Sequence, residues 1–171
     1  PPARTTADAG PLIDHILRQF HEPHRAALAD LQALADSLPA DGATAGLADS
    51  LRAVAQALEL HMFKEEMRLF PMMEQGGNTL IGQLIDDLHR EHQAHATAMQ
   101  ALQVRLAACA GAAGAHPALH RLAGGVDALA AALAAHIHAE DALLFPLFLP
   151  AAPAVAGLRP APGAGAPGPR A

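Results

Sequence analysis

Two stretches decide the fold, HMFKEEMRLFPM at residues 61–72 and HIHAEDALLFPL at residues 136–147. Each places a glutamate four residues after a histidine, a second acid directly after that glutamate, and Leu-Phe-Pro shortly afterwards. Side chains four residues apart share one face of an α-helix, and here that face also carries the leucines of an apolar stripe. The sequence therefore predicts two amphipathic helices whose buried faces carry a histidine and a glutamate.

The apolar periodicity extends over four segments of the 171-residue chain. Each segment repeats apolar side chains at steps of three and four, which is typical of helices that pack on a common core. Glycine- and proline-rich stretches separate the segments, and Pro23 lies inside the first, where it predicts a bend near His21. The predicted helices cover about residues 11–38, 47–71, 81–106 and 119–144.

Four helices of similar length with short connections predict an all-α fold, an antiparallel up-down-up-down four-helix bundle over residues 11–149. Abundant alanine and leucine, with neither tryptophan nor tyrosine, also favour packed helices over a sheet. Residues 1–10 are expected to be a disordered lead and residues 150–171 a disordered Pro/Gly/Ala tail, because neither offers enough apolar side chains to bury.

Composition argues against several classes of function. A formal net charge of −6 with a single lysine gives no basic face for a phosphate backbone, so no nucleic-acid partner is expected. Cys109 is the only cysteine and cannot form an internal disulfide, which favours a reducing compartment and a cytoplasmic location. The most apolar stretch, residues 126–149, contains acids and histidines, so no membrane span is expected.

Acids on buried helix faces need compensation. Burying an ionised carboxylate is costly unless a partner neutralises it, and no lysine or arginine falls on these stripes near the two glutamates. A histidine pair, HEPH at residues 21–24 and HQAH at residues 92–95, also precedes each histidine–glutamate helix, so one pattern occurs twice. An antiparallel bundle would gather both sets of donors around a pseudo-twofold axis, where bound metal could neutralise the acids. The predicted metal ligands are His21, His61, Glu65, His92, His136 and Glu140, the histidines as terminal ligands and the glutamates as bridges between two ions.

The donor set restricts the metal. Imidazole nitrogen and carboxylate oxygen without a thiolate suit iron, manganese or zinc. Two octahedral ions need about twelve donor atoms and the protein supplies about eight, which leaves about four positions for an oxo or hydroxo bridge and for exogenous ligands. The donor set alone leaves the choice among these three metals open.

The remaining histidines and acids receive other roles. His24 and His95 lie one turn further along the buried stripes and are expected to hydrogen-bond the bridging glutamates rather than to ligate. Glu66 and Asp141 flank the ligands and are expected to face solvent. Five histidines off the stripes or near helix ends are expected to be solvated or to cap helices: His15, His89, His116, His120 and His138.

The order FHEPHR, HMFKEEMRLFP, REHQAH and HIHAEDALLFP closely resembles the hemerythrin-like, or HHE cation-binding, domain over about residues 11–149. Within that family it resembles the di-iron proteins linked to repair of iron centres damaged by nitric oxide or oxidants. The resemblance implies a four-helix bundle with a non-haem di-iron centre held by the six predicted ligands. Two iron ions are therefore the expected content, ahead of manganese or zinc. It also implies partners, namely a diatomic ligand, O2 or NO, or an apo iron-sulfur protein.

The sequence departs from the repair proteins in two respects. The repair proteins it resembles carry one more histidine ligand just beyond the first helix, where this sequence has DSLPADGATAG at residues 36–46 and no histidine. They also usually carry a small cysteine-bearing N-terminal domain, which is absent from the sequence given. The candidates to replace the missing histidine are Asp36, Asp41, His24, His95 and water.

Three functions fit these features. The di-iron centre could handle nitric oxide or oxidative stress by donating iron or capturing the gas, it could carry or sense dioxygen reversibly, or its metal could be purely structural. Histidine-rich ligation in the order HxxxE argues against a ferroxidase, whose sites use more carboxylates and the order ExxH. A carrier expects nearly saturated irons and a structural site expects closed coordination, so the open positions favour the stress response. No catalytic residue is assigned, and the sequence leaves open whether the protein is an enzyme.

Overall fold

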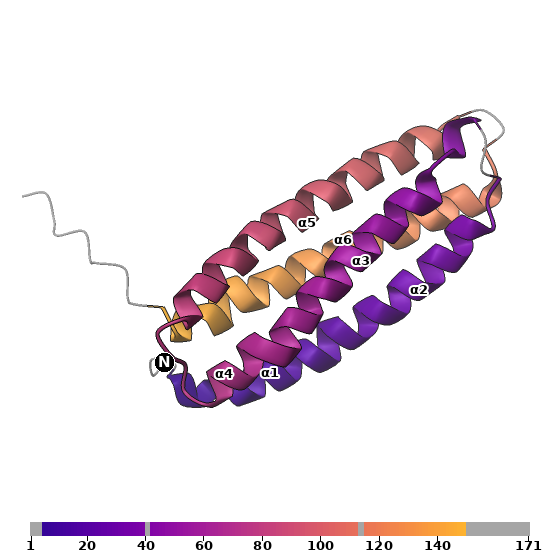
Figure 1. Cartoon of the computed structure of the whole chain (residues 1–171). Coiled ribbons are helices and arrows are strands. Elements are labelled where there is room, and N and C mark those ends of the chain that lie inside the picture. The colour runs from indigo at the N-terminus through magenta and orange to yellow at the C-terminus, as the bar shows by residue number, and fades with distance from the viewer. Residues whose placement is uncertain (1–4, 40–41, 113–114, 150–171) are drawn as a thin grey trace, which may run out of the picture.

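The computed structural model describes residues 5–39, 42–112 and 115–149, and every regular element among them is helical. Four long rods lie side by side (Figure 1). The first rod consists of α1 (Ala9–Ile16), η2 (Leu17–His21) and α2 (Glu22–Asp36). The second consists of α3 (Leu47–Lys64), η4 (Glu65–Leu69) and α4 (Phe70–Glu74). The third is α5 (Ile81–Ala110), and the fourth consists of α6 (Pro117–Ala139), η5 (Glu140–Leu144) and η6 (Phe145–Leu147).

The rods form an antiparallel up-down-up-down bundle. Helix α2 packs against α3 and α6, and α5 packs against the same two helices, so the four rods enclose one interior. Successive rods run in opposite directions, and the connection from α2 to α3 lies at the same end as the connection from α5 to α6 (Figure 1). The predicted all-α four-helix bundle is confirmed.

The first helix begins earlier than the sequence analysis predicts. The Thr5 N–H donates to Asp8 Oδ2 at 2.7 Å, and this capping bond starts a short 3-10 turn, η1 (Thr6–Asp8). Ala9 follows and is buried in the core. The expected disordered lead is therefore wrong for residues 5–10, because a capped turn and a buried alanine tie them to the bundle. The rest of the lead and the whole expected tail lie outside the described residues.

Three of the four rods contain a π-helical turn, η2, η4 or η5, and a proline follows each turn. In each rod, the residue directly before the proline donates its N–H to the carbonyl five residues earlier. The accepting carbonyls are those of Leu17, Glu65 and Glu140. A widened turn tolerates the missing N–H of the proline and keeps its ring off the preceding carbonyls. The first of these turns ends where the sequence predicts a bend. The prediction that the second helix ends near Pro71 is wrong, because this geometry lets the chain continue through α4 to Glu74.

The interior is layered along the bundle axis. One apolar cluster, which includes Leu51 and Leu106, fills the end that holds the connection from α2 to α3. A second cluster, which includes Ile85 and Leu144, fills the opposite end. Between them lies a layer of buried polar side chains, so this layer is walled by apolar groups on both sides. Its members are His21, His24, His61, Glu65, His92, His95, His136 and Glu140.

Two adjacent glycines in α6 have different surroundings. A Cβ on Gly125 would lie 2.5 Å from Leu31 Cδ2, whereas a Cβ on Gly124 would meet nothing within 4 Å. We expect Gly124→Ala to raise the free energy of unfolding by about 0.5–1 kcal/mol through helix propensity. Gly125→Ala should lose that gain, because Leu31 would have to move within a packed core. Urea denaturation of the two variants checks this, and equal stabilisation of both would contradict the close approach.

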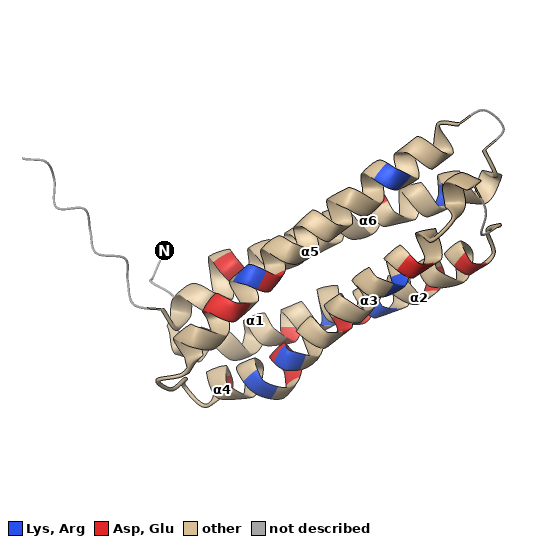
Figure 2. Cartoon of the chain, turned by 45° about the horizontal axis from the view of Figure 1, so that its top comes forward, with Lys and Arg blue, Asp and Glu red and all other residues tan. Residues whose placement is uncertain are grey.

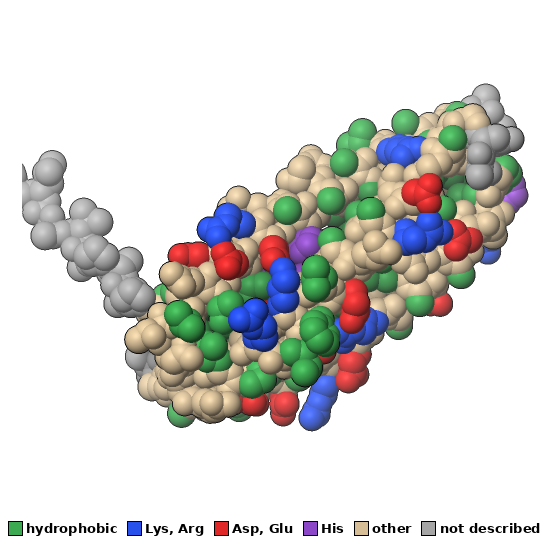
Figure 3. Space-filling model, in the orientation of Figure 1, with side chains coloured by type: hydrophobic (Ala, Val, Ile, Leu, Met, Phe, Trp, Pro, Cys, Tyr) green, Lys and Arg blue, Asp and Glu red, His purple; other side chains and the backbone are tan. Residues whose placement is uncertain are grey.

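Charged side chains cover the outer faces of the helices. Both signs are interspersed along the rods in the view of Figure 2. On the face shown in Figure 3, charged side chains of both signs lie among exposed hydrophobic side chains along much of the length of the bundle. Neither view shows a face of one sign.

One helical stretch has the length and composition of a membrane span. It runs over Pro117–Leu147, and an 18-residue window within it has a mean hydropathy of 1.3. The same stretch is the fourth rod of the bundle and holds His136 and Glu140 in the polar layer. Since the core helix of a bundle meets the same criteria, this stretch is weak evidence for a membrane span.

Candidate metal centre

The polar layer brings the six predicted ligands together from all four rods. Each of the six side chains is at most 3% exposed. The first rod supplies one histidine from η2, and α5 supplies another. The second and fourth rods each supply a histidine and, at the start of a π-helical turn, a glutamate. The structure thus places the predicted ligands side by side, while their ligation of metal stays a prediction.

The four histidines form two pairs with facing nitrogens. In pair A, His21 Nε2 lies 3.2 Å from His136 Nε2, and in pair B, His61 Nε2 lies 3.1 Å from His92 Nε2. Two nitrogens that each lie about 2.1 Å from a common ion, at roughly a right angle, are about 3 Å apart. The spacing within each pair therefore fits two ligands of one ion.

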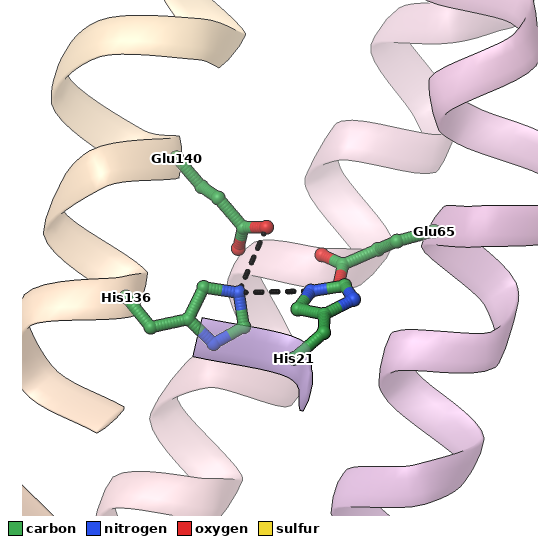
Figure 4. Close-up of side chains that lie close together, drawn as sticks. All are labelled: His21, Glu65, His136 and Glu140. Carbon is green, nitrogen blue, oxygen red and sulfur yellow. Dashed lines mark hydrogen bonds and ion pairs between the residues drawn. The ribbon is translucent and has the colours of Figure 1, made fainter. Parts of the chain in front are cut away.

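Each glutamate reaches both pairs. Glu65 places Oε2 3.3 Å from His21 Nε2 in pair A and Oε1 3.3 Å from His61 Nε2 in pair B. Glu140 places Oε1 3.1 Å from Nε2 of His136 in pair A and Oε2 3.0 Å from Nε2 of His92 in pair B. Figure 4 shows the two carboxylates approaching the centre from opposite rods. A carboxylate with one oxygen at each of two ion positions has the arrangement of a bridging ligand.

Ionisation of both buried carboxylates is energetically unfavourable without a cation. Burial raises the pKa of Glu65 well above its usual value, and the neighbouring charge of Glu140 raises it further. Burial also opposes ionisation of Glu140, but His136 and His92 outweigh it, and the pKa of Glu140 is lowered. Both oxygens of Glu65 and Oε2 of Glu140 are buried without a hydrogen bond. Unsatisfied buried acceptors of this kind fit an ion site, because a cation would satisfy them.

Three further carboxylates hold the outer nitrogens of the histidines. His21 Nδ1 lies 2.8 Å from Glu66 Oε1, and His92 Nδ1 lies 3.0 Å from Asp141 Oδ1. His61 Nδ1 lies 3.0 Å from Glu91 Oε2. A ring that donates from Nδ1 to a carboxylate presents the lone pair of Nε2 to the interior, which is the tautomer that a metal requires.

The expectation that Glu66 and Asp141 face solvent is wrong. Both lie about 100° around the helix from the bridging glutamate before them, and there the Nδ1 edge of a histidine from a neighbouring rod meets them. Their side chains are only 25% and 37% exposed. Glu91 was not predicted at all. The sequence feature that could have indicated Glu91 is its position directly before His92. For Glu66 and Asp141 that feature is the acid repeated directly after each bridging glutamate.

His24 and His95 are buried as expected but do not bond the glutamates. Nε2 of each has no hydrogen-bond partner among the described residues. Their rings lie against the ligand histidines instead, His24 with its centroid 5.2 Å from that of His136 and His95 with its centroid 4.9 Å from that of His61. The prediction fails because the glutamate oxygens are already directed at Nε2 of the two pairs. Desolvation lowers the pKa of His24 to about 4, so it is neutral at pH 7.

The residues proposed to replace the missing histidine ligand differ in their distance from the polar layer. Asp36 lies at the end of α2 and pairs with Arg52 at 3.1 Å, so it is not part of the polar layer. Asp41 lies outside the described residues. Only His24 and His95 lie beside the two pairs, and His95 belongs with His61 and Glu91 to a third group of closely spaced donor atoms.

Comparison with known proteins identifies the family. The sequence matches the Hemerythrin HHE cation binding domain over residues 12–148. The chain belongs to this hemerythrin family. The predicted resemblance is thereby confirmed, and the buried histidine and glutamate groups of this hemerythrin-like chain are ones that could hold a metal.

Several bacterial relatives share most of this hemerythrin-like chain. The iron-sulfur cluster repair protein DnrN of Neisseria gonorrhoeae is 35% identical over 145 residues, which are 81% of this chain and 90% of that protein. The iron-sulfur cluster repair protein YtfE of Dickeya chrysanthemi is 31% identical over 145 residues, 82% of this chain and 66% of that protein. YtfE of Yersinia pseudotuberculosis is 31% identical over 140 residues, 79% of this chain and 63% of that protein. The chain thus spans about two thirds of the YtfE proteins and nearly all of DnrN.

The outer carboxylates give a testable prediction for this hemerythrin-like site. We expect Glu66→Ala to weaken metal binding about 10–100-fold, because His21 loses the acceptor that fixes its ring and tautomer. Glu59→Ala is the matched control, since Glu59 also pairs with Arg25, at 2.8 Å, but touches no histidine of the layer. Metal titration followed by calorimetry measures both variants. If Glu66→Ala binds metal as tightly as Glu59→Ala does, Glu66 has no part in the site.

Proposed function

We propose that this hemerythrin-like chain holds two iron ions, one at pair A and one at pair B, and serves the response to nitric oxide or oxidants by supplying iron to damaged iron-sulfur proteins. One observation carries the proposal: Glu65 and Glu140 each place one carboxylate oxygen at pair A and the other at pair B. The names of the relatives, iron-sulfur cluster repair proteins, support the choice of role.

The donor atoms form an open site that accepts iron. Each position is offered two imidazole nitrogens and two carboxylate oxygens, with no thiolate, which suits iron, manganese or zinc. The names of the relatives support iron among these. When bound, iron supplies a redox-active Lewis acid that can take a diatomic ligand or be passed on. Four donors at each position are fewer than the about six that an octahedral ion takes, so roughly two sites per ion stay open.

The protein's own residues prepare the site to bind cations. Glu66, Glu91 and Asp141 hold the rings of three histidines, and Arg25 and Lys64 hold two of these carboxylates in turn. The apolar clusters on either side restrict water to the polar layer, which strengthens the attraction between carboxylate and cation. Two glutamates against two divalent ions leave the centre with net positive charge, which favours anionic or reducible diatomic ligands such as O2 or NO.

The open coordination separates this role from the two alternatives. A reversible dioxygen carrier needs irons that are nearly saturated by protein ligands, whereas each position here is formed by a group of four donor residues. A purely structural metal needs closed coordination, which four donors to an octahedral ion do not give. Donation of iron to an apo iron-sulfur acceptor is compatible with both the open positions and the names of the relatives.

The experiment uses protein purified without air. Metal analysis should give about two irons per chain, and mixing with an apo iron-sulfur acceptor and added inorganic sulfide should transfer iron and restore the cluster of the acceptor. Retention of iron, together with stable and reversible bleaching under dioxygen, would replace the repair role with that of a carrier. Colourless protein that contains zinc would leave only a structural metal.

A further inference from the structure

Three of the four ligand histidines have a carboxylate at Nδ1, and the fourth does not. The three are His21, His61 and His92, with partners at 2.8 to 3.0 Å. His136 Nδ1 is buried and has no hydrogen-bond partner among the described residues. The ring of His24 lies beside it, with centroids 5.2 Å apart, but no hydrogen bond joins the two. Pair B therefore has two supported histidines, and pair A has one.

The difference follows from one position of the sequence repeat. Glu91 directly precedes His92 in the second half of the chain, and Phe20 directly precedes His21 in the first half. In the bundle Glu91 accepts from His61, the histidine of the facing rod. At the equivalent place Phe20 stacks on His136, with ring centroids 5.3 Å apart and an angle of 13° between the planes. A phenyl ring offers no acceptor to Nδ1, so the pseudo-twofold symmetry of the site is broken here.

The missing acceptor matters for metal affinity. A carboxylate at Nδ1 fixes the ring, selects the tautomer with a free Nε2 lone pair and makes that nitrogen a better donor to an ion. Removal of such a partner typically weakens metal binding about 10–100-fold. His136 can turn or change tautomer at lower cost than the other three histidines, so the ion that it binds is held less firmly.

We propose that the two ion positions are unequal, with Glu91 and Phe20 as the positioning residues that make them so. The ion at pair B is bound about 10–100-fold more tightly, and the ion at pair A is the one that leaves first. The inference rests on the proposed function, because it names which of the two irons this chain would supply to an acceptor. It also means that partly loaded protein carries iron between His61 and His92.

Partial loading tests the inequality directly. Metal-free protein receives one equivalent of iron(II) without air and is crystallised, and anomalous diffraction at the iron edge gives the occupancy of each position. Because the two positions share one equivalent, the occupancy ratio is the square root of the affinity ratio, so we expect the peak at pair B to exceed the peak at pair A about 3- to 10-fold. Equal peaks, or a stronger peak at pair A, would overturn the inference.

Variants at the two equivalent places supply the second arm. Glu91→Ala should bring the two occupancies close to equal, and Phe20→Glu should do the same by giving His136 an acceptor. Asp87→Ala is the control, because Asp87 lies one turn before Glu91 on α5, is exposed and pairs with Arg90 rather than with a ligand. An unchanged occupancy ratio in both Glu91→Ala and Phe20→Glu would show that these residues do not set the preference.

Loading with excess iron(II) separates this inference from the proposed function. Two filled positions at excess, with equal filling at one equivalent, would sink the inequality and leave the di-iron proposal standing. A single filled position at excess would contradict the di-iron proposal itself. The inference and its parent proposal both hold only when pair B fills first and pair A fills second.

Discussion

Replacing Glu65 with leucine is expected to abolish binding of the second metal ion and, at the same time, to stabilise the metal-free protein. Both oxygens of Glu65 are buried without a hydrogen bond, and burial raises the pKa of this carboxyl well above its usual value. Exchange of a poorly satisfied buried carboxyl for an apolar side chain of similar size commonly stabilises a protein by about 1–4 kcal/mol. For a chain of this length that corresponds to a rise in Tm of roughly 2–4 °C per kcal/mol.

Glu140→Leu provides the contrast that makes the prediction sharp. It should abolish binding of the second ion as well, but it should destabilise the metal-free protein by about 3–5 kcal/mol. Glu140 lies within 3.1 Å of both His136 and His92, and its carboxylate helps raise the pKa of His92 to about 9. Removal of Glu140 therefore leaves a buried histidine charge with less compensation. Thermal denaturation after chelation measures both variants, and Glu59→Leu, an exposed substitution, should leave Tm and metal content nearly unchanged.

The opposite signs are the point of the comparison. The two glutamates occupy equivalent places in the sequence repeat, so an account based on burial alone expects them to behave alike. We expect that Glu65 lowers the stability of the metal-free protein and serves to bind metal. Destabilisation of the metal-free protein by Glu65→Leu would contradict this. Retention of two ions by either leucine variant would contradict the bridging arrangement.

Removal of metal from the native protein is the second large effect. An ion present at a thousand times its dissociation constant stabilises the folded state by about 4 kcal/mol, so two ions contribute about 8 kcal/mol. Chelation should therefore lower Tm by roughly 15–30 °C, at 2–4 °C per kcal/mol. Differential scanning calorimetry before and after chelation measures the shift. The Glu65→Leu variant is the control, because it retains at most one ion and its transition should shift by no more than about half as much with the same chelator.

A small shift would have a clear meaning. A change of Tm below about 2 °C in the native protein would correspond to less than about 1 kcal/mol and would show that the polar layer is not held together by metal. The eight buried histidines and glutamates would then have to be stabilised without metal, by protons shared among themselves. The structure does not support this, because both oxygens of Glu65 lack a hydrogen-bond partner.

The sequence predicts the fold well because the signal is periodic and repeated. Apolar side chains at helical spacing define all four rods, and the twofold histidine–glutamate pattern places the polar layer at the same depth in each. The ends of the helices are less predictable. A proline at position 71 is typical of a helix end. Only the widened turn Glu65–Leu69 shows why the helix continues beyond it.

The outer part of the site could be predicted only in part. Glu66 and Asp141 lie off the apolar stripe of their own helices, so periodicity alone assigns them to the surface. Their role depends on which edge of a histidine the neighbouring rod presents, and that is set by packing between rods. Glu91 and Phe20 occupy the same place in the repeat, and a comparison of the two halves at this position would have revealed the break in symmetry.

Anomalous diffraction from crystals of fully iron-loaded protein shows whether two ions share the two glutamates. We predict two iron peaks, one beside His21 and His136 and the other beside His61 and His92, with an oxygen of Glu65 and an oxygen of Glu140 at each peak. A single peak, or glutamates turned away from the metal, would contradict this prediction.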